Sequence, residues 1–308
     1  MTTARDAVRE YRSELRKDAR LSVLENHLVE AIKTLPPIRL ERINLHQIPD
    51  NPREGIFLLS DWHIGSYVNN FYNQFDFDVA IKRVNQLAKD VIRYCHMFNI
   101  TKLNILDLGD IIEGEIHVTV RVTNELNTCD QVIKATELLA QFIATVAAEI
   151  DEVVYRSCVG NHDRVIQNYK ESTDDDNLIY LINWGLQMRL QLSGVDNVIF
   201  DLQNLSDTMG IFELENGKKV GYAHGHTFST DTAYQNFTGA VQSYLDYICL
   251  GHFHSGKMKE FNSVKVYVNG SLKGVDSYAM TKNLYSKPSQ TLIIPDGEND
   301  LDFRINLR

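Results

Sequence analysis

Five short apolar runs in this chain each end in side chains that can bind a metal ion, and this repeated ending limits the fold more than any other feature. The runs are "IFLLS", "NILDL", "VYRSCV", "KVGYA" and "YICLG". Short apolar runs bounded by turn residues and separated by longer helical patterns predict buried strands alternating with helices. In open α/β sheets, sites assemble in the loops beyond the carboxyl ends of the strands. We therefore expect an α/β fold with one site at these strand ends.

The side chains after these runs form a set of oxygen and nitrogen ligands. They are Asp61 and His63, then Asp110, then Asn161 within "GNHD", then His224, and finally His252 and His254. A set without thiolates suits Mn²⁺, Fe or Zn²⁺ better than Ca²⁺ or a cysteine zinc site. These are too many ligands for one ion that must also bind substrate, and they suit two ions about 3.5–4 Å apart that share a carboxylate. We expect Asp110 to be the bridge, because its strand lies between the others in sequence order.

Each of these motifs also has a reading without any metal. Asp61 and His63 alone suit a strand-end cap, "GNHD" alone suits a turn because Gly and Asn tolerate positive φ, and His252 and His254 alone suit surface imidazoles. All five motifs would have to be coincidences together for this reading to hold. Their joint occurrence after five apolar runs favours a metal centre.

The two ends of the chain differ from this central pattern. Residues 3 to 36 predict a helix with Leu24, Leu28 and Ile32 on one face, which ends at "LPP". In the second half, Asn216-Gly217 lies between two alternating runs and predicts a hairpin. Strand–helix alternation followed by hairpins predicts two stacked sheets with helices outside. We expect a helical extension over residues 1–50 and one domain over 51–308, in which Asp130 is the N-cap of a helix.

Composition limits where the protein works and what it binds. The chain has 308 residues, no apolar stretch of the roughly 18 residues needed to span a bilayer, and a charged N-terminus without a signal core. Its four cysteines lie far apart, which favours a reducing cytoplasm over a disulfide framework. The net charge of −10 means that any positive charge facing nucleic acid must be local or supplied by bound metal. We expect a cytoplasmic protein with no membrane partner.

In order, the motifs D-x-H, G-D, G-N-H-D, H and G-H-x-H resemble those of the calcineurin-like metallophosphoesterase superfamily. The resemblance covers roughly residues 55 to 295, and "NGSLKGVDSYA" with "KPSQ" is similar to phage-type members related to DNA-repair exonucleases. It implies a four-layer α/β/β/α sandwich of two mixed sheets flanked by helices. It also implies two divalent ions, with Mn²⁺ expected first and Fe or Zn²⁺ as alternatives.

The resemblance implies a role for each motif residue. One ion would be held by Asp61, His63, Asp110 and His254, and the other by Asp110, Asn161, His224 and His252. His162 would contact the phosphate or protonate the leaving group, and Asp163 would hydrogen-bond its ring. Arg164 and His117 are candidate phosphate contacts. Glu113 reaches the metals or pairs with a nearby base, and His226 belongs to the outer shell.

The implied activity is hydrolysis of a phosphate ester by metal-activated water. Our first interpretation is a nuclease that acts on DNA or RNA, because of the phage-type tail and the long segment 114–130, which could border an extended substrate. The alternative is a small-molecule phosphoesterase, such as a cyclic nucleotide phosphodiesterase or a phosphatase. A third interpretation is a non-catalytic metal-bound scaffold. The N-terminal helices could also form a homodimer.

Overall fold

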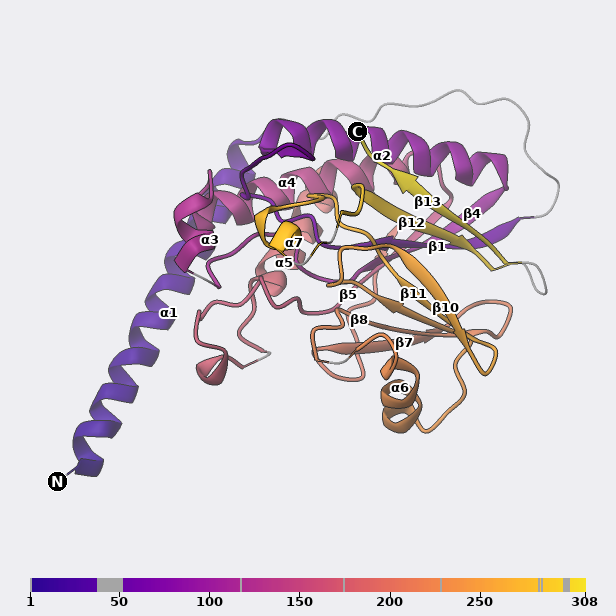
Figure 1. The fold of residues 1–308 in the computed structure, drawn as a ribbon. Coiled ribbons are helices and arrows are strands. Elements are labelled where there is room, and N and C mark those ends of the chain that lie inside the picture. The colour runs from indigo at the N-terminus through magenta and orange to yellow at the C-terminus, as the bar shows by residue number, and fades with distance from the viewer. Residues whose placement is uncertain are drawn as a thin grey trace. The chain divides into compact units, whose positions relative to one another are not determined.

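Two mixed β-sheets, face to face, form the centre of the chain after residue 52 in the computed structural model (Figure 1). The structure describes residues 2–37, 52–116, 118–173, 175–227, 229–281, 283, 285–295 and 300–308. The chain divides into two units, Met1–Pro37 and Ile38–Arg308. The first unit consists mainly of α1 (Thr2–Thr34), which confirms the predicted N-terminal helix. The predicted boundary between residues 50 and 51 lies outside the described residues.

The larger sheet has the order β13-β12-β1-β4-β5-β6. Its strands are β1 (Arg53–Leu59), β4 (Ile100–Asp107), β5 (Glu152–Ser157), β6 (Val198–Phe200), β12 (Ser289–Ile294) and β13 (Leu301–Asn306). Strands β1, β4, β5 and β6 are parallel to one another. At one edge, β12 pairs antiparallel with β1, and β13 pairs antiparallel with β12. The carboxyl ends of β1, β4 and β5 therefore lie side by side, as the sequence predicts.

The smaller sheet has the order β10-β11-β9-β8-β7. Its strands are β7 (Met209–Glu213), β8 (Lys219–Ala223), β9 (Tyr247–Leu250), β10 (Lys257–Phe261) and β11 (Val264–Val268). The antiparallel pair β7–β8 confirms the hairpin predicted at Asn216-Gly217. Strands β8 and β9 are parallel, so the residues after Ala223 and Leu250 emerge at the same edge.

Helices cover the outer faces of both sheets, which confirms the predicted α/β/β/α sandwich. Helices α2 (Phe77–Met97), α4 (Thr128–Ala147) and α5 (Leu178–Leu192) flank the larger sheet, where Phe57 of β1 packs on Phe142 of α4 with ring centroids 5.6 Å apart. Helix α6 (Ala233–Val241) covers the smaller sheet with Phe237. Between the sheets, Ile56 and Leu106 share one buried cluster with Tyr222.

Four short elements complete the described structure: β2 (Val68–Asn69), β3 (Gln74–Phe75), α3 (Val118–Thr123) and α7 (Ser277–Thr281), with one 3-10 turn at Tyr169–Glu171. The predicted N-cap at Asp130 is wrong. Helix α4 begins three residues earlier than this cap would place it, and Asn127 caps it by accepting a hydrogen bond from the backbone N–H of Asp130. An asparagine fills this position as well as an aspartate does, so the sequence pattern could not choose between them.

Gly109 joins β4 to the predicted ligand Asp110 and offers a test of how closely the strand ends are packed. Its φ is +86°, and a Cβ there would lie 2.6 Å from the backbone of Gly160. Gly217, in the β7–β8 turn, has a similar φ of +80° but open space around it. We expect Gly217→Ala to lower the free energy of unfolding by about 1–2 kcal/mol for the left-handed conformation. Gly109→Ala should lower it by about 1–3 kcal/mol more, because of the added clash.

Urea unfolding of the two variants beside the wild type would measure this difference. Equal losses would show that the strand ends can separate enough to accept a methyl group.

Candidate metal centre

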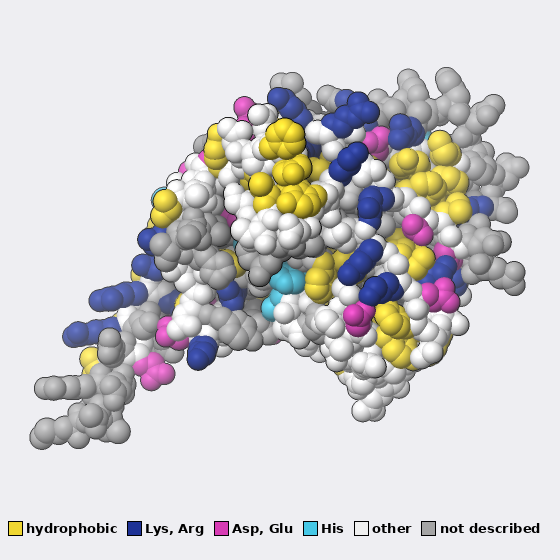
Figure 2. Space-filling view, viewed as in Figure 1, with side chains coloured by type: hydrophobic (Ala, Val, Ile, Leu, Met, Phe, Trp, Pro, Cys, Tyr) yellow, Lys and Arg dark blue, Asp and Glu magenta, His cyan; other side chains and the backbone are white. Residues whose placement is uncertain are grey.

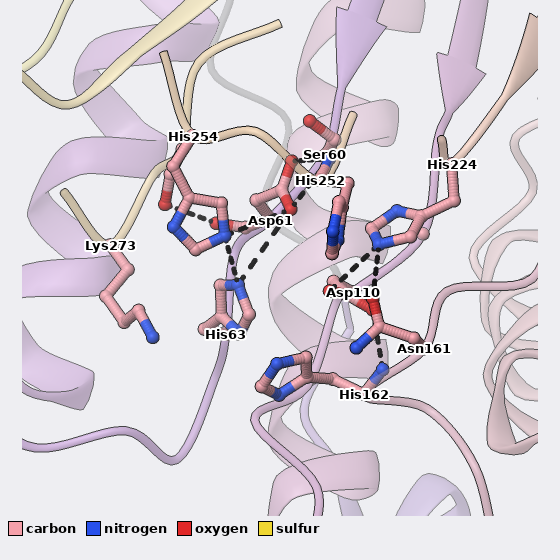
Figure 3. Close-up of polar contacts among 12 residues, drawn as sticks. Ser60, Asp61, His63, Asp110, Asn161, His162, His224, His252, His254 and Lys273 are labelled. Atoms are coloured by element: carbon pink, nitrogen blue, oxygen red, sulfur yellow. Dashed lines mark hydrogen bonds and ion pairs between the residues drawn. The ribbon is translucent and has the colours of Figure 1, made fainter. Parts of the chain in front are cut away.

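The seven predicted ligand side chains come together where the carboxyl ends of the two sheets meet. Figure 3 shows the labelled side chains of the two sheets pointing toward one common space. The backbone holds the edges together, because the N–H of Asp61 donates to the carbonyl of Gly109 at 3.0 Å and the N–H of Leu272 donates to the carbonyl of Asp61 at 3.1 Å. The structure thus brings together all seven residues that the sequence selected: Asp61, His63, Asp110, Asn161, His224, His252 and His254.

Five of these seven residues have a left-handed backbone: Asp61, His63, Asp110, His252 and His254, with φ between 51° and 67°. Such a conformation costs of order 1–3 kcal/mol for a residue with a side chain, and it tends to persist at functional sites. Asp and His are among the residues that tolerate it best. The strand-end loops therefore direct these side chains inward at an energetic cost that the fold must offset.

One group of ligand atoms gathers around Asp61. His63 Nε2 lies 3.0 Å from His254 Nε2, and Asp61 Oδ1 lies 3.3 Å from His254 Nε2 and 3.9 Å from His63 Nε2. Ligand atoms that share one ion at about 2.1 Å lie about 3.0–3.4 Å apart in octahedral or tetrahedral geometry. The spacing of this group therefore fits a single metal ion with little adjustment.

A second group gathers around His224. Its Nε2 lies 3.0 Å from Asn161 Oδ1 and 3.1 Å from Asp110 Oδ2, and the ligand atoms of Asp110, His224 and His252 lie within 4.8 Å of one another. Asp110 also belongs to a group with His63 and His162. It is thus the carboxylate that lies near residues of both predicted ion sites, as its expected bridging role requires.

Asp110 also provides the direct test of whether these residues suit a cation. Its Oδ1 accepts a hydrogen bond from the backbone N–H of His162 at 2.7 Å. Its Oδ2 is buried and accepts no hydrogen bond from the described residues, and the charge opposite it is the His224 ring, whose Nε2 lies 3.1 Å away. A buried carboxylate oxygen without a donor is costly unless another positive group satisfies it. The donor set therefore fits bound cations.

His63, His252 and Asp61 already have the charges that metal ligands need. Burial lowers the pKa of His63 and of His252 to about 4, so both rings are neutral near pH 7. Burial would raise the pKa of Asp61, but the neighbouring His254 outweighs it and lowers the pKa to about 2. For His224, burial is outweighed by the Asp110 carboxylate, which raises the pKa to about 9. Metal binding at His224 would therefore release a proton.

A hydrogen bond and an ion pair from outside the ligand set orient two of the histidines. His224 Nδ1 faces the carbonyl of Leu108 at 2.6 Å, which leaves Nε2 for the site. His63 Nδ1 lies 2.8 Å from Glu113 Oε2, and Glu113 in turn lies 3.1 Å from the ammonium of Lys273. A carboxylate behind a ligating histidine fixes its tautomer and strengthens it as a ligand. Of the two roles left open for Glu113, the structure thus shows pairing with a base.

Lys273 is the residue whose importance the sequence signalled least. It is buried, and it lies 2.8 Å from Asp276 as well as against Glu113. Burial opposes its charge, but these carboxylates outweigh burial and raise its pKa. The pairing of Lys273 with Glu113 depends on how segment 272–276 approaches the larger sheet. Nothing in the local sequence connects Lys273 to Glu113, which lies 160 positions earlier.

The predicted hydrogen bond between Asp163 and the His162 ring is wrong. His162 Nδ1 lies 2.8 Å from the carbonyl of Glu113. The Asp163 carboxylate instead accepts from the backbone N–H groups of Asp110 and Ile112, at 2.8 and 3.3 Å. Asp163 is buried beneath the loop, and a buried carboxylate binds the nearest unpaired amides. It therefore positions the backbone at Asp110 rather than the ring of His162.

The remaining predicted residues are placed as follows. Arg164 is half-buried after the "GNHD" loop. Burial, with the neighbouring His224, lowers the pKa of His226 to about 4, and Arg164 adds a smaller contribution. The His226 ring lies 5.5 Å from that of His224, next to the second group. His117 lies outside the described residues.

Glu113 yields a quantitative prediction. Glu113→Gln removes the charge behind His63, and changes to such outer partners typically lower metal affinity 10–100-fold, so we expect a drop of about that size in Mn²⁺ affinity by calorimetry. Glu115→Gln is the matched control, because Glu115 lies on the same loop and contacts Thr128 instead. Equal affinities for the two variants would contradict the role assigned to Glu113.

No family model matches the chain. The chain is similar to the SPbeta prophage-derived uncharacterized protein YonJ of Bacillus subtilis (strain 168), with 22% identity over 292 residues. The match covers 86% of this chain and 66% of that protein, so the chain spans just under two thirds of its relative.

Solved structures with a similar arrangement include Vps29 from Cryptosporidium parvum, with 14% identity and a TM-score of 0.41, over 83% of this chain and 92% of that one. A novel archaeal phosphodiesterase has 12% identity and a TM-score of 0.40, over 82% and 99%. Vps29 of Entamoeba histolytica complexed with Zn²⁺ has 12% identity and a TM-score of 0.36, over 82% and 99%. The sheet order and the converging strand ends, rather than these scores, agree with the metallophosphoesterase fold that the sequence resembles.

Proposed function

We propose that this protein is a phosphodiesterase that depends on two divalent metal ions and cleaves nucleic acid. The observation that carries the proposal is the place of Asp110, whose carboxylate belongs to ligand groups on both sides of it. Asp61, His63, Asp110 and His254 would hold one ion, and Asp110, Asn161, His224 and His252 the other. When bound, two such ions neutralise charge on phosphate oxygens and lower the pKa of a bound water. Mn²⁺ is the first candidate for this oxygen and nitrogen set, with Fe or Zn²⁺ as alternatives.

His162 would act on the substrate directly. Its Nδ1 faces the Glu113 carbonyl, which favours a proton on Nδ1 and directs Nε2 to its other side. In the protonated ring, Nε2–H donates to a phosphate oxygen and then passes its proton to the leaving oxygen as the P–O bond breaks. The ring centroid lies 4.6 Å from that of His63, so the donor stands beside the first ligand group. Arg164 is the proposed second phosphate contact.

The openness of the site supports a polymeric substrate. Asp61, His63, Asp110 and His224 are buried, whereas Asn161, His162, His252 and His254 are partly exposed. Figure 2 shows histidine side chains at the surface in a recessed part of this face. A phosphodiester in the middle of a strand could reach such a site, whereas a small ligand is usually enclosed over most of its surface.

The net charge of −10 supports the alternative of a small-molecule phosphoesterase, because an acidic protein attracts polyanions weakly. The scaffold interpretation is the weaker one, since it expects a lost ligand or a lost His162, and this chain retains all of them. Among the described residues, no helix is long and apolar enough to cross a membrane. Dimerisation through residues 1–50 stays a prediction, which the mass of a chain without them would test.

A substrate panel separates these functions. Protein loaded with Mn²⁺ would be offered single- and double-stranded DNA, RNA and cyclic nucleotides, with His162→Ala in parallel to reveal contaminating nuclease. Degradation of polynucleotide by the wild type alone supports the proposal. Turnover restricted to cyclic or small phosphodiesters would establish the alternative, and no turnover with two bound metals would favour the scaffold.

A further inference from the structure

A group of aromatic side chains is exposed on the hairpin formed by β2 and β3 and on the segment after α7. Phe71 is 93% exposed, Tyr72 55% and Tyr285 49%. We refer to these three residues as the aromatic cluster. Tyr67, four positions after the ligand residue His63, is also 52% exposed. Figure 2 shows hydrophobic side chains gathered on the face that also carries the exposed histidines.

The rings of the aromatic cluster contact one another but leave their outer faces free. The centroids of Phe71 and Tyr72 are 5.1 Å apart with perpendicular planes, and those of Tyr72 and Tyr285 are 4.8 Å apart with planes at 48°. Such tilted pairs support one another without burying their faces. Burial in the core is therefore not what places these rings here.

The hairpin under the cluster is held rigidly. Asn70 Oδ1 accepts from the backbone N–H groups of Tyr72 and Asn73, at 2.8 and 2.9 Å. The Asn73 amide donates to the carbonyl of Lys273 at 2.7 Å, and the buried Arg83 donates to Asn73 Oδ1 and to the same carbonyl, both at 2.8 Å. A buried arginine with fixed partners makes this a preorganised surface rather than a loose loop.

A chain of ion pairs links the segment that holds this hairpin to the candidate metal centre. Lys273, whose carbonyl holds the hairpin, places its ammonium 3.1 Å from Glu113, and Glu113 lies 2.8 Å from the ring of His63. The side chains of Glu113 and Lys273 thus connect His63, in the first ligand group, to the carbonyl that binds Asn73 of the hairpin.

The chemistry of the cluster indicates its ligand. In the described parts of segments 64–75 and 277–288, the exposed large apolar side chains are all aromatic. Flat, open rings beside a centre suited to phosphodiesters are the platform on which unpaired bases stack. Lys287, exposed two positions after Tyr285, adds a cation for the sugar-phosphate backbone. Aromatic side chains are also enriched at protein interfaces, so a protein partner is the competing outcome of the test below.

We propose that the aromatic cluster binds unpaired bases of single-stranded nucleic acid whose backbone runs into the metal centre. The inference rests on the proposed function and narrows its substrate to strands with exposed bases. Duplexes, whose bases are already stacked on one another, would gain nothing from these rings. The protein should therefore bind and cleave single strands in preference to duplexes of the same length.

Binding of a labelled short oligothymidylate tests the proposal by fluorescence anisotropy. The protein is the full chain loaded with Mn²⁺ and carrying His162→Ala, so that the strand is not consumed. We expect Phe71→Ala and Tyr72→Ala each to raise the Kd about 5- to 100-fold. Tyr244→Ala is the matched control, because Tyr244 is 54% exposed just before β9, at the end of that strand opposite His252, and should leave the Kd unchanged.

An abasic oligonucleotide of the same length separates base stacking from other contacts. It should bind the parent protein more weakly than oligothymidylate does, and Phe71→Ala should not weaken it further. Equal effects of Phe71→Ala and Tyr244→Ala, or equal losses for the two oligonucleotides, would overturn the inference. So would a changed oligomer mass for Phe71→Ala with unchanged binding, which would identify a protein interface instead. Since binding is measured without hydrolysis, an inactive wild type would refute the proposed function and leave this result intact.

Discussion

Asp110→Asn is expected to lower phosphodiester hydrolysis by at least about 10³-fold and to reduce the bound metal from two ions to one or none. The side chain keeps its shape, so the hydrogen bond from the backbone N–H of His162 to Oδ1 can persist. What disappears is the negative charge shared between the two ligand groups. The buried Oδ2, which has no donor among the described residues, is replaced by a neutral amide atom. Metal analysis of the purified variant and hydrolysis of an oligonucleotide would measure both effects.

Asp107→Asn is the matched control for Asp110→Asn. Asp107 is the last residue of β4 and is equally buried, but it belongs to none of the ligand groups found among the described residues. Burial raises its pKa to about 7, so its carboxyl is already partly neutral near pH 7. Its Oδ1 accepts from the Gly109 amide, which an asparagine oxygen can also do. Activity within about tenfold of wild type is expected, and comparable losses for the two variants would indicate a general effect of buried charge rather than a bridging role.

His162→Ala should lower the turnover of oligonucleotides about 10²- to 10⁴-fold while both metals remain bound. The ring belongs to no ion site in the proposed assignment, and its Nδ1 is occupied by the Glu113 carbonyl. Its proposed task is to protonate the leaving oxygen. An aryl phosphodiester, whose leaving group departs without a proton, should therefore lose much less activity than DNA, whose leaving group is an alkoxide.

The ratio of these two losses separates catalysis by His162 from a structural role. Equal losses on both substrates would show that His162 positions the phosphate without donating a proton. Loss of bound metal in the variant would show that His162 is a ligand, in keeping with its place in a group with His63 and Asp110.

The candidate ligands could be predicted from the sequence because each follows a short apolar run. Parallel strands bring their carboxyl ends to one edge, so the order of strands along the chain was enough to gather Asp61, Asp110 and Asn161. Predicting His252 and His254 as ligands required one further assumption, that the smaller sheet meets the larger sheet at the same edge. The N–H of His252, which donates to Asp61 at 3.1 Å, shows that it does.

The supporting residues could not be predicted, because their partners are distant in sequence. Lys273 meets Glu113 across 160 positions only through the path that the chain takes after β11. Asp163 follows His162 directly, yet its carboxylate accepts hydrogen bonds from backbone N–H groups at the end of another strand, β4. The hairpin of the aromatic cluster depends on Arg83, which is buried and donates to the carbonyl of Leu272. The sequence around Arg83 does not indicate this contact.

The most direct test of the account is an anomalous-difference map from crystals of the wild-type protein grown with Mn²⁺. Two peaks about 3.5–4 Å apart, with the Asp110 carboxylate between them, His63 and His254 beside one and His224 and His252 beside the other, are the predicted result. A single peak, or two peaks that do not share Asp110, would contradict the dinuclear centre on which the proposed chemistry depends.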